Sequence, residues 1–191
     1  LEQYADLTSI GTIGDVVPLT GENRIIVRRG LSEMQYSENE GLLSLISVAG
    51  LDPEEMTSTG VAFGLCPRIN AAGRLGDASR AVELLISDNY AAATEIAVEL
   101  DDGNIKRQKI EQEITLAACD IIYDKKIYNN RVMVVASEGW HEGVLGIAAA
   151  RISEKFSRPT ILLSRNSEDE PYKGSARTVR EFKIFAAMDN A

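Results

Sequence analysis

The sequence predicts an α/β protein in three parts: helices over residues 1–76, a helical connector over residues 77–127, and a small α/β domain over residues 128–191. Apolar residues recur at helical spacing before residue 128. After it, short apolar runs typical of strands alternate with loops and one helical pattern. A hydrophobic content of 45% in 191 residues is sufficient for real cores.

Short helices separated by turn signals are predicted for residues 1–76. The helical patterns are GENRIIVRRGLSEM, SENEGLLSLISVAG and TSTGVAFGL, and we expect the last of them to stop at Pro67. In the following CPRINAAGRLGD, Pro67, Gly73 and Gly76 are expected to prevent one continuous helix. That stretch is therefore predicted to be a shaped loop.

The connector is predicted to be mainly helical. Asp77 is a candidate N-cap for ASRAVELLIS, and Asp88 is a candidate N-cap for a pattern that runs to about Asp124. Gly103 should weaken the middle of this second helix by ~1 kcal/mol. An unbroken helix of that length would measure ~50 Å. A long and polar helix of this kind usually joins two lobes.

The last part changes from helical to strand-like periodicity. RVMVVAS and PTILLS predict buried strands, YKGSARTV an extended segment, and VLGIAAARISEKF a helix that follows the loop EGWHEG. The polar stretch RNSEDEPYKG is expected to be a surface loop, and a further helix should follow YKGSARTV.

Composition excludes a membrane-spanning protein, because no apolar run approaches the ~18 residues that a bilayer requires. The N-terminus lacks a basic segment followed by an apolar one, so we expect a cytoplasmic protein. The formal net charge of −9 argues against a general nucleic-acid-coating protein. Residues 129–191 nevertheless contain nine Lys or Arg against eight Asp or Glu, and a few placed donors suffice to bind a phosphate.

The two cysteines, Cys66 and Cys119, lie far apart among apolar neighbours and fit no metal-ligand spacing. We expect both to be buried free thiols.

Asp15 interrupts the aliphatic segment SIGTIGDVVPL. A carboxylate buried there would cost several kcal/mol unless a cation or several donors compensated it. A cation ligand is one interpretation of this residue, and a local cap for the following turn is the other.

Arg68, Asn70 and Arg74 follow one another closely in CPRINAAGRLGD. Two guanidinium groups and a carboxamide on a shaped loop suit the recognition of phosphate or sugar, because arginine offers bidentate geometry to an oxyanion. The alternative is a pair of surface arginines bonded to carbonyl groups at helix ends.

Two further groups of residues suit an anion. His141 and Gly143 precede a helix N-terminus, where free N–H groups and the helix dipole favour negative charge. In KGSARTV, a glycine allows close approach, while Ser175 supplies a hydroxyl and Arg177 a guanidinium. A structural or merely exposed histidine is the alternative for His141.

Four segments together resemble the RecJ exonucleases of the DHH phosphoesterase superfamily: LTSIGTIGDVVPLTGENRIIVRRGL, PRINAAGRLGDASRAVELL, GWHEGVLGIAAARISEKFSRPTILLS and KGSARTVREF. The resemblance covers essentially the whole chain in the family's order. It implies that residues 1–76 are the C-terminal part of a DHH catalytic domain and residues 128–191 a DHH-associated substrate-binding domain.

The resemblance also implies roles for individual residues. Asp15 matches a catalytic metal ligand for Mn²⁺ or Mg²⁺. Substrate or phosphate binding is implied for Arg68, Asn70, Arg74, His141, Gly143, Ser175 and Arg177. The last motif reads GSAR, with Ala176 where the family usually has glycine, so the closeness of backbone approach differs at that point.

One family feature is absent from the sequence. The chain has a single histidine and therefore cannot contain the Asp-His-His triplet that the family's metal centre needs. It also begins at Leu1 without methionine and ends within a helical pattern, so we expect a fragment that is inactive by itself.

The resemblance implies that the parent protein hydrolyses single-stranded DNA from the 5′ end with a divalent metal. Its implied role is in DNA repair and recombination, with other DNA-repair proteins as partners and no membrane partner. Two alternatives are a DHH-type phosphodiesterase acting on oligonucleotides or cyclic dinucleotides, and a non-catalytic replication-factor relative.

Overall fold

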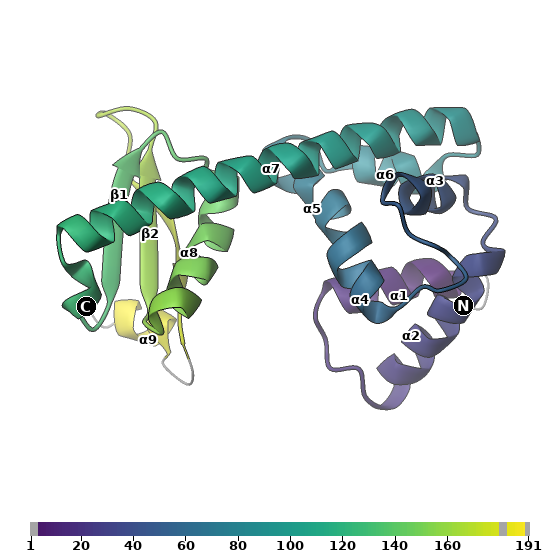
Figure 1. The fold of residues 1–191 in the computed structure, drawn as a ribbon, viewed down its shortest axis with the longest axis horizontal. Coiled ribbons are helices and arrows are strands. Elements are labelled where there is room, and N and C mark those ends of the chain that lie inside the picture. The colour runs from purple at the N-terminus through teal and green to yellow at the C-terminus, as the bar shows by residue number, and fades with distance from the viewer. Residues whose placement is uncertain (1–3, 180–182, 190–191) are drawn as a thin grey trace. The chain divides into compact units, whose positions relative to one another are not determined.

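The computed structural model describes residues 4–179 and 183–189, in two compact units, Leu1–Ile105 and Lys106–Ala191. The α/β class predicted from the sequence is confirmed, with helices predominating and one three-stranded sheet (Figure 1). Within the described residues, no helix is both long enough and apolar enough to cross a lipid bilayer.

The first unit is helical throughout. Its elements are α1 (Ala5–Gly14), α2 (Gly21–Glu33), η2 (Met34–Tyr36), α3 (Glu40–Val48), α4 (Ser58–Gly60), η3 (Val61–Leu65), α5 (Cys66–Leu75), α6 (Ser79–Ile86) and the first part of α7 (Tyr90–Asp124). They enclose a core that includes Ile13, Val27, Met34, Leu42, Leu45, Val61, Leu65 and Leu84. The short helices predicted for this part are confirmed, except that the last one does not stop at Pro67.

Two glycines allow helices of this unit to pack backbone to backbone. A Cβ at Gly30 of α2 would overlap the carbonyl oxygen of Ala5 in α1. A Cβ at Gly41 of α3 would likewise overlap the carbonyl oxygen of Leu84 in α6. Because both partners are main-chain atoms, neither contact could be relieved by a rotamer change.

The loop predicted for CPRINAAGRLGD is wrong, since Cys66–Leu75 forms α5 and continues a helical run from α4. Pro67 is tolerated because it occupies the first turn of α5, directly after the π-helical turn Val61–Leu65, where the hydrogen-bond pattern changes. Buried Cys66 and Ala71 hold α5 to the core despite Gly73, and the helix ends at Gly76.

Both caps predicted for the connector are displaced by one residue. Ala78 is the N-cap residue of α6, although Asp77 before it accepts hydrogen bonds from the backbone N–H of Ser79 at 2.8 Å and from its hydroxyl at 2.7 Å. Asp88 is the wrong cap for α7. The helix begins at Tyr90, so Asn89 precedes it and its side-chain oxygen accepts from the N–H of Ala92 at 3.0 Å.

Helix α7 is unbroken over 35 residues, as the pattern from Asn89 to Asp124 predicts. Gly103 lies in its interior, and a Cβ there would have no neighbour within 4 Å. The helix contributes residues to both units, which divide between Ile105 and Lys106. The division at residues 76, 127 and 128 expected from the sequence stays a prediction.

The second unit contains the sheet, in the order β1 (Met133–Glu138), β2 (Thr160–Arg165), β3 (Lys173–Arg177). Strands β1 and β2 are parallel and are joined by α8 (Glu142–Phe156), whereas β2 and β3 are antiparallel. The short helices η4 (Ile127–Asn129) and α9 (Ile184–Asp189) complete the unit. The elements predicted for this part are confirmed.

Helix α8 packs on the sheet and contacts both β2 and β3 (Figure 1). Its buried face comprises Val144, Leu145, Ala148, Ala149, Ile152 and Ser153. Met133, Val135 and Leu162 of the sheet are almost completely buried. Cys119 and Cys66 are buried free thiols, as predicted.

A buried carboxylate links α7 to α8 in the second unit. Glu111 is 1% exposed, and its Oε2 accepts a hydrogen bond from Nη1 of Arg107 at 2.8 Å. Its Oε1 forms an ion pair with Nε of Arg151, although that contact lacks hydrogen-bond geometry. Two guanidinium groups thus compensate one buried negative charge and fix α8 against this part of α7.

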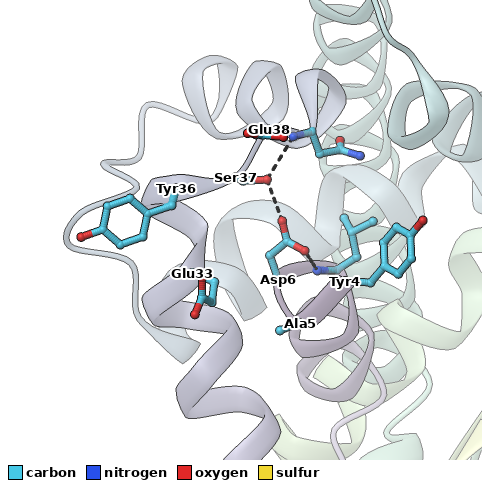
Figure 2. Close-up of a pocket in the computed structure, with 9 residues that line it drawn as sticks. Tyr4, Ala5, Asp6, Glu33, Tyr36, Ser37 and Glu38 are labelled. Carbon is cyan, nitrogen blue, oxygen red and sulfur yellow. Dashed lines mark hydrogen bonds between the residues drawn. The ribbon is translucent and has the colours of Figure 1, made fainter. Parts of the chain in front are cut away.

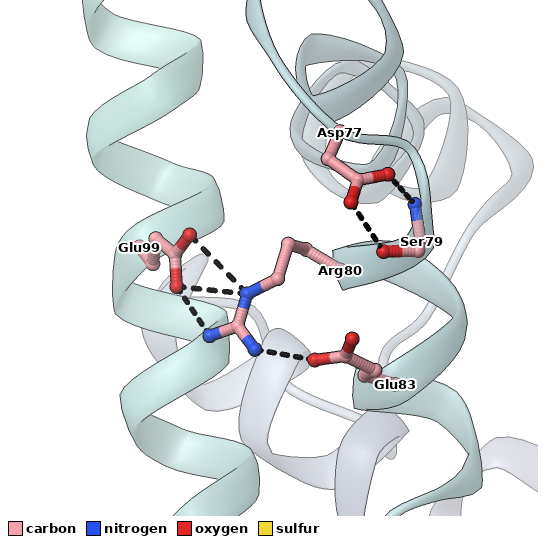
Figure 3. A network of polar contacts seen from close by, with 5 residues as sticks. All are labelled: Asp77, Ser79, Arg80, Glu83 and Glu99. Atoms are coloured by element: carbon pink, nitrogen blue, oxygen red, sulfur yellow. Dashed lines mark hydrogen bonds and ion pairs between the residues drawn. The ribbon is translucent and has the colours of Figure 1, made fainter.

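A polar network joins α6 to α7 in the first unit (Figure 3). Arg80 donates to Glu99 through Nε at 3.1 Å and also pairs with Glu83. The hydrogen bond from Arg80 holds the pKa of Glu99 below its usual range, and the pKa of Arg80 is raised by Glu99 and then by Glu83. The Ser79 N–H and hydroxyl lower the pKa of Asp77.

We expect Gly41→Ala to lower the free energy of unfolding by ~1–3 kcal/mol, because the new methyl group must separate the backbones of α3 and α6. Urea unfolding followed by circular dichroism measures the change. Gly11→Ala is the matched control, since a Cβ at this α1 position has no neighbour within 4 Å and alanine favours helix. Equal stability of the two variants would contradict the close packing.

Acid should weaken the first unit through the network of Arg80. A carboxyl group whose folded-state pKa is lowered contributes stability that is complete above its unfolded pKa, about 4.3 for Glu and about 3.9 for Asp. That contribution is lost as the pH falls through the folded-state pKa values of Glu99 and Asp77. Thermal unfolding at a series of pH values should therefore depend less steeply on pH in Arg80→Ala, whereas Arg24→Ala should keep the wild-type slope.

Candidate functional site

The GWH loop turns the chain from β1 into α8. Gly139 has a φ of +75°, a left-handed conformation that glycine adopts without strain. Trp140 is 9% exposed and fixes the loop to the core of the second unit. His141 follows as the N-cap of α8 and is exposed. The tryptophan therefore serves the fold, while the histidine next to it reaches solvent.

The His141 ring caps α8 through one nitrogen only. Its Nδ1 accepts a hydrogen bond from the N–H of Gly143 at 3.2 Å, so Nδ1 carries no proton in this arrangement. The proton of the neutral ring then lies on Nε2, which makes that nitrogen a donor. The positive end of the α8 dipole lies at the same place, because the helix begins at Glu142.

Strand β3 presents Ser175 and Arg177 to α8. The two residues are two positions apart, so their side chains point to the same face of the sheet. Nη1 of Arg177 donates to Oγ of Ser175 at 3.1 Å and to the carbonyl oxygen of Ala176 at 2.8 Å. Among residues 4–179 and 183–189, no carboxylate pairs with Arg177, which is exposed.

Gly146 of α8 faces these two side chains. An ideal Cβ at Gly146 would lie 2.8 Å from Nη2 of Arg177 and 3.0 Å from Oγ of Ser175. Lys173, at the start of β3, pairs with Glu142 at the start of α8 with a shortest distance of 3.1 Å. The beginnings of α8 and β3 are therefore close together, and Ser175 and Arg177 lie further along the strand, against Gly146.

Gly174 allows a close approach between neighbouring strands. A Cβ there would overlap the carbonyl oxygen of Leu162 in β2 and the side chain of Leu163, its partner in the register. Ala176 lies half-buried opposite Ile161, so β3 accommodates a methyl group at the position where the resembling family usually has glycine.

In the first unit, Arg68 is already neutralised. Its Nε lies 2.8 Å from Oδ1 of Asp101, although without hydrogen-bond geometry, and its Nη1 donates to the carbonyl oxygen of Gly64 at 2.6 Å. This is the helix-carbonyl alternative considered for the arginines of this segment. Arg74 is half-buried near the end of α5, and Asn70 is exposed on the same helix.

Asp15 is the C-terminal capping residue of α1 and is exposed, so the cost considered for a buried carboxylate does not arise. Its N–H donates to the carbonyl oxygen of Gly11 at 3.0 Å. No group of three or more His, Cys, Asp or Glu suited to a metal ion occurs within the described residues. These residues do not form a metal centre, and Asp15 can supply at most one ligand to one.

A cavity of about 350 Å³ lies at the start of α1, but its buried acid is already satisfied (Figure 2). Asp6 accepts from the N–H of Leu7 at 2.7 Å and from Oγ of Ser37 at 2.6 Å. Asn39 caps α3 and donates to the carbonyl oxygen of Leu85 in α6 at 2.8 Å. These contacts tie α1, α3 and α6 together and leave no buried acid available to a ligand.

Two residues of importance escaped the sequence analysis. The partner of Arg68, Asp101, lies 33 positions away on α7, and nothing in the sequence pairs them. Gly146 could have been identified from the sequence, because a glycine inside an apolar helical pattern usually has a packing reason.

Comparisons with known proteins show what this chain is similar to. Residues 129–191 match the DHHA1 domain family. The chain is 39% identical over 187 residues to the single-stranded-DNA-specific exonuclease RecJ of Bacillus subtilis (strain 168), covering 98% of this chain and 24% of that protein.

Crystal structures of RecJ from Thermus thermophilus in complex with Mg²⁺ and with Mn²⁺ are also similar. Their TM-scores are 0.83 and 0.82 at 34% identity, and each comparison covers 98% of this chain and 28% of the RecJ chain. The chain thus spans about a quarter of the length of these relatives. Residues 129–191 thus match the DHHA1 domain, and almost the whole chain is similar to a segment of the RecJ proteins.

Proposed function

We propose that this chain is a substrate-binding segment of a RecJ-type exonuclease that hydrolyses single-stranded DNA from the 5′ end. The observation that carries the proposal is the group of anion-type donors, Ser175 and Arg177, held against α8 close to its start. The names of the relatives support single-stranded DNA as the substrate, since the Bacillus subtilis protein is a single-stranded-DNA-specific exonuclease.

The donors of this site are suited to a terminal phosphate of DNA. Arg177 has no carboxylate partner among the described residues, so its charge is available to an oxyanion, and Ser175 adds a hydroxyl. His141 contributes Nε2 at the start of α8, where the helix dipole favours negative charge, and the N–H of Gly143 holds the ring through Nδ1. Each charge-assisted hydrogen bond contributes about 1.5–3 kcal/mol.

The proposal gives the arginines of α5 different roles. Asn70 and Arg74 are assigned to the substrate, as the family resemblance implies. Arg68 is assigned to the fold instead, because Asp101 and the carbonyl oxygen of Gly64 already bind its guanidinium.

Mn²⁺ or Mg²⁺ is the proposed cofactor of the whole enzyme, supported by the RecJ crystal structures that contain these ions. Such ions activate water and stabilise the charge of phosphodiester cleavage when several ligands hold them. The described residues do not provide that set, so no catalytic step is assigned to them. Asp15 is proposed as one ligand of a centre completed by other residues.

The names of the relatives favour this function over a cyclic-dinucleotide phosphodiesterase. Action in DNA repair and recombination, contacts with other repair proteins and a cytoplasmic location belong to the same proposal.

Arg177→Ala should weaken binding of a 5′-phosphorylated single-stranded oligonucleotide by about tenfold or more, since one charge-assisted bond is lost. Fluorescence anisotropy with a labelled oligonucleotide measures the dissociation constant, and the difference should grow at low salt. Arg131→Ala removes the same charge from an exposed position of the same unit and serves as the control. Equal affinities of the two variants would contradict the phosphate site.

Catalysis can be tested in a chimera in which this chain replaces the matching segment of Bacillus subtilis RecJ. The chimera should digest single-stranded DNA with Mn²⁺ or Mg²⁺ and not with EDTA. Asp15→Ala should abolish digestion without changing the melting temperature, and Asp88→Ala, at another exposed aspartate, should not affect digestion. The 191-residue chain alone should be inactive.

Full digestion by the Asp15→Ala chimera would remove Asp15 from the metal centre. A folded chimera that binds single-stranded DNA but never cleaves it would instead favour the non-catalytic replication-factor relative.

A further inference from the structure

We propose that Gly146 is a positioning residue: the absence of a side chain there sets the location of the Arg177 guanidinium and thereby the strength of phosphate binding. The inference rests on the proposed function, because it assigns Gly146 to the same anion site. Gly146 does not itself touch the phosphate in this proposal and acts through Arg177.

The contact geometry leaves no room for a Cβ at Gly146 while the Arg177 guanidinium stays where it lies. A Cβ on Gly146 would lie 2.8 Å from Nη2 and 3.5 Å from Cζ of Arg177, so the guanidinium lies directly over the bare helix backbone. The same Cβ would lie 3.0 Å from Oγ of Ser175. Both donors of the proposed site would therefore be displaced by a single methyl group.

The surroundings of Arg177 show why its position is sensitive. On one side, Nη1 is bound to Oγ of Ser175 and to the carbonyl oxygen of Ala176. On the other side, Nη2 lies against α8 at Gly146. The guanidinium is held between the strand and the helix, and no carboxylate of the described residues fixes it. The space at Gly146 therefore helps to define the orientation of the Arg177 guanidinium.

The fold itself should tolerate alanine at position 146. The crowded atoms belong to the ends of two side chains, which can move, whereas the crowded atom at Gly41 is a backbone carbonyl oxygen. Alanine also favours the helical conformation more than glycine does. Gly146 is therefore expected to matter for the ligand and not for stability, which separates it from a glycine kept for helix packing.

The variants Gly146→Ala, Arg177→Ala and Gly146→Ala/Arg177→Ala test the inference in the 191-residue chain, with Gly103→Ala as the control. Gly103 also lies inside a helix, but a Cβ there would meet nothing within 4 Å. The probe is a 5′-phosphorylated thymidine dinucleotide, titrated by NMR to obtain the dissociation constant. Thermal unfolding and the Nε–Hε resonance of Arg177, identified by its loss in Arg177→Ala, are recorded without ligand.

We expect Gly146→Ala to weaken binding by about threefold to tenfold, up to the loss of one charge-assisted bond. Its melting temperature should be unchanged or higher, and the Arg177 resonance should shift. In the Arg177→Ala background the same substitution should have a much smaller effect on affinity, because only the displacement of Ser175 remains. Gly103→Ala should alter neither the affinity nor the resonance.

Several results would overturn the inference. Wild-type affinity in Gly146→Ala, with weak binding in Arg177→Ala, would leave the phosphate site in place and remove Gly146 from it. An equal loss in both backgrounds would show that Gly146 acts independently of Arg177, and a lowered melting temperature would show a packing role. Wild-type affinity in Arg177→Ala would refute the proposed phosphate site itself, together with its positioning residue.

Discussion

The site in the second unit depends on close approach of backbone to neighbouring groups where glycine leaves out a side chain. Gly174 allows β3 to lie against the Leu162 carbonyl of β2, and Gly146 leaves space on α8 for Ser175 and Arg177. The close contact at Gly174 fixes the position of β3, and the space at Gly146 lets the side chains of Ser175 and Arg177 lie over α8. Adding one methyl group at either glycine would displace neighbouring atoms, because protein interiors are closely packed.

Charge pairing decides which basic residues remain available in this acidic chain. Asp101 neutralises Arg68, Glu111 is shared by Arg107 and Arg151, and Glu138 binds Arg165. Arg177 has no such partner among the described residues, although its strand begins with the paired Lys173. A net charge of −9 is therefore compatible with one locally positive site, because a ligand responds to the unpaired charge nearby.

Local patterns predicted most of the fold, whereas long-range contacts decided the rest. The strands and α8 follow from periodicity, and α7 from its long helical pattern, because these signals lie within each segment. The sequence did not predict the helix over Cys66–Leu75, because Pro67 was expected to prevent it. A π-helical turn directly before this helix accommodates Pro67, and the residue pattern does not predict such a turn. The motifs located Ser175 and Arg177, but only the folded structure could pair Arg68 with Asp101 or place Gly146 beside Arg177.

The capping role of His141 argues for its role as a ligand-binding residue. A helix N-cap is filled well by Ser, Thr, Asn or Asp, so capping alone does not call for histidine. These alternatives also differ in what they would leave at the start of α8, since Asp would add a negative charge, Ser has only its capping hydroxyl, and Asn would keep a shorter amide donor. Histidine caps Gly143 through Nδ1 and still offers Nε2 as a donor. A cap that also offers a donor is what an anion site beside the helix start requires.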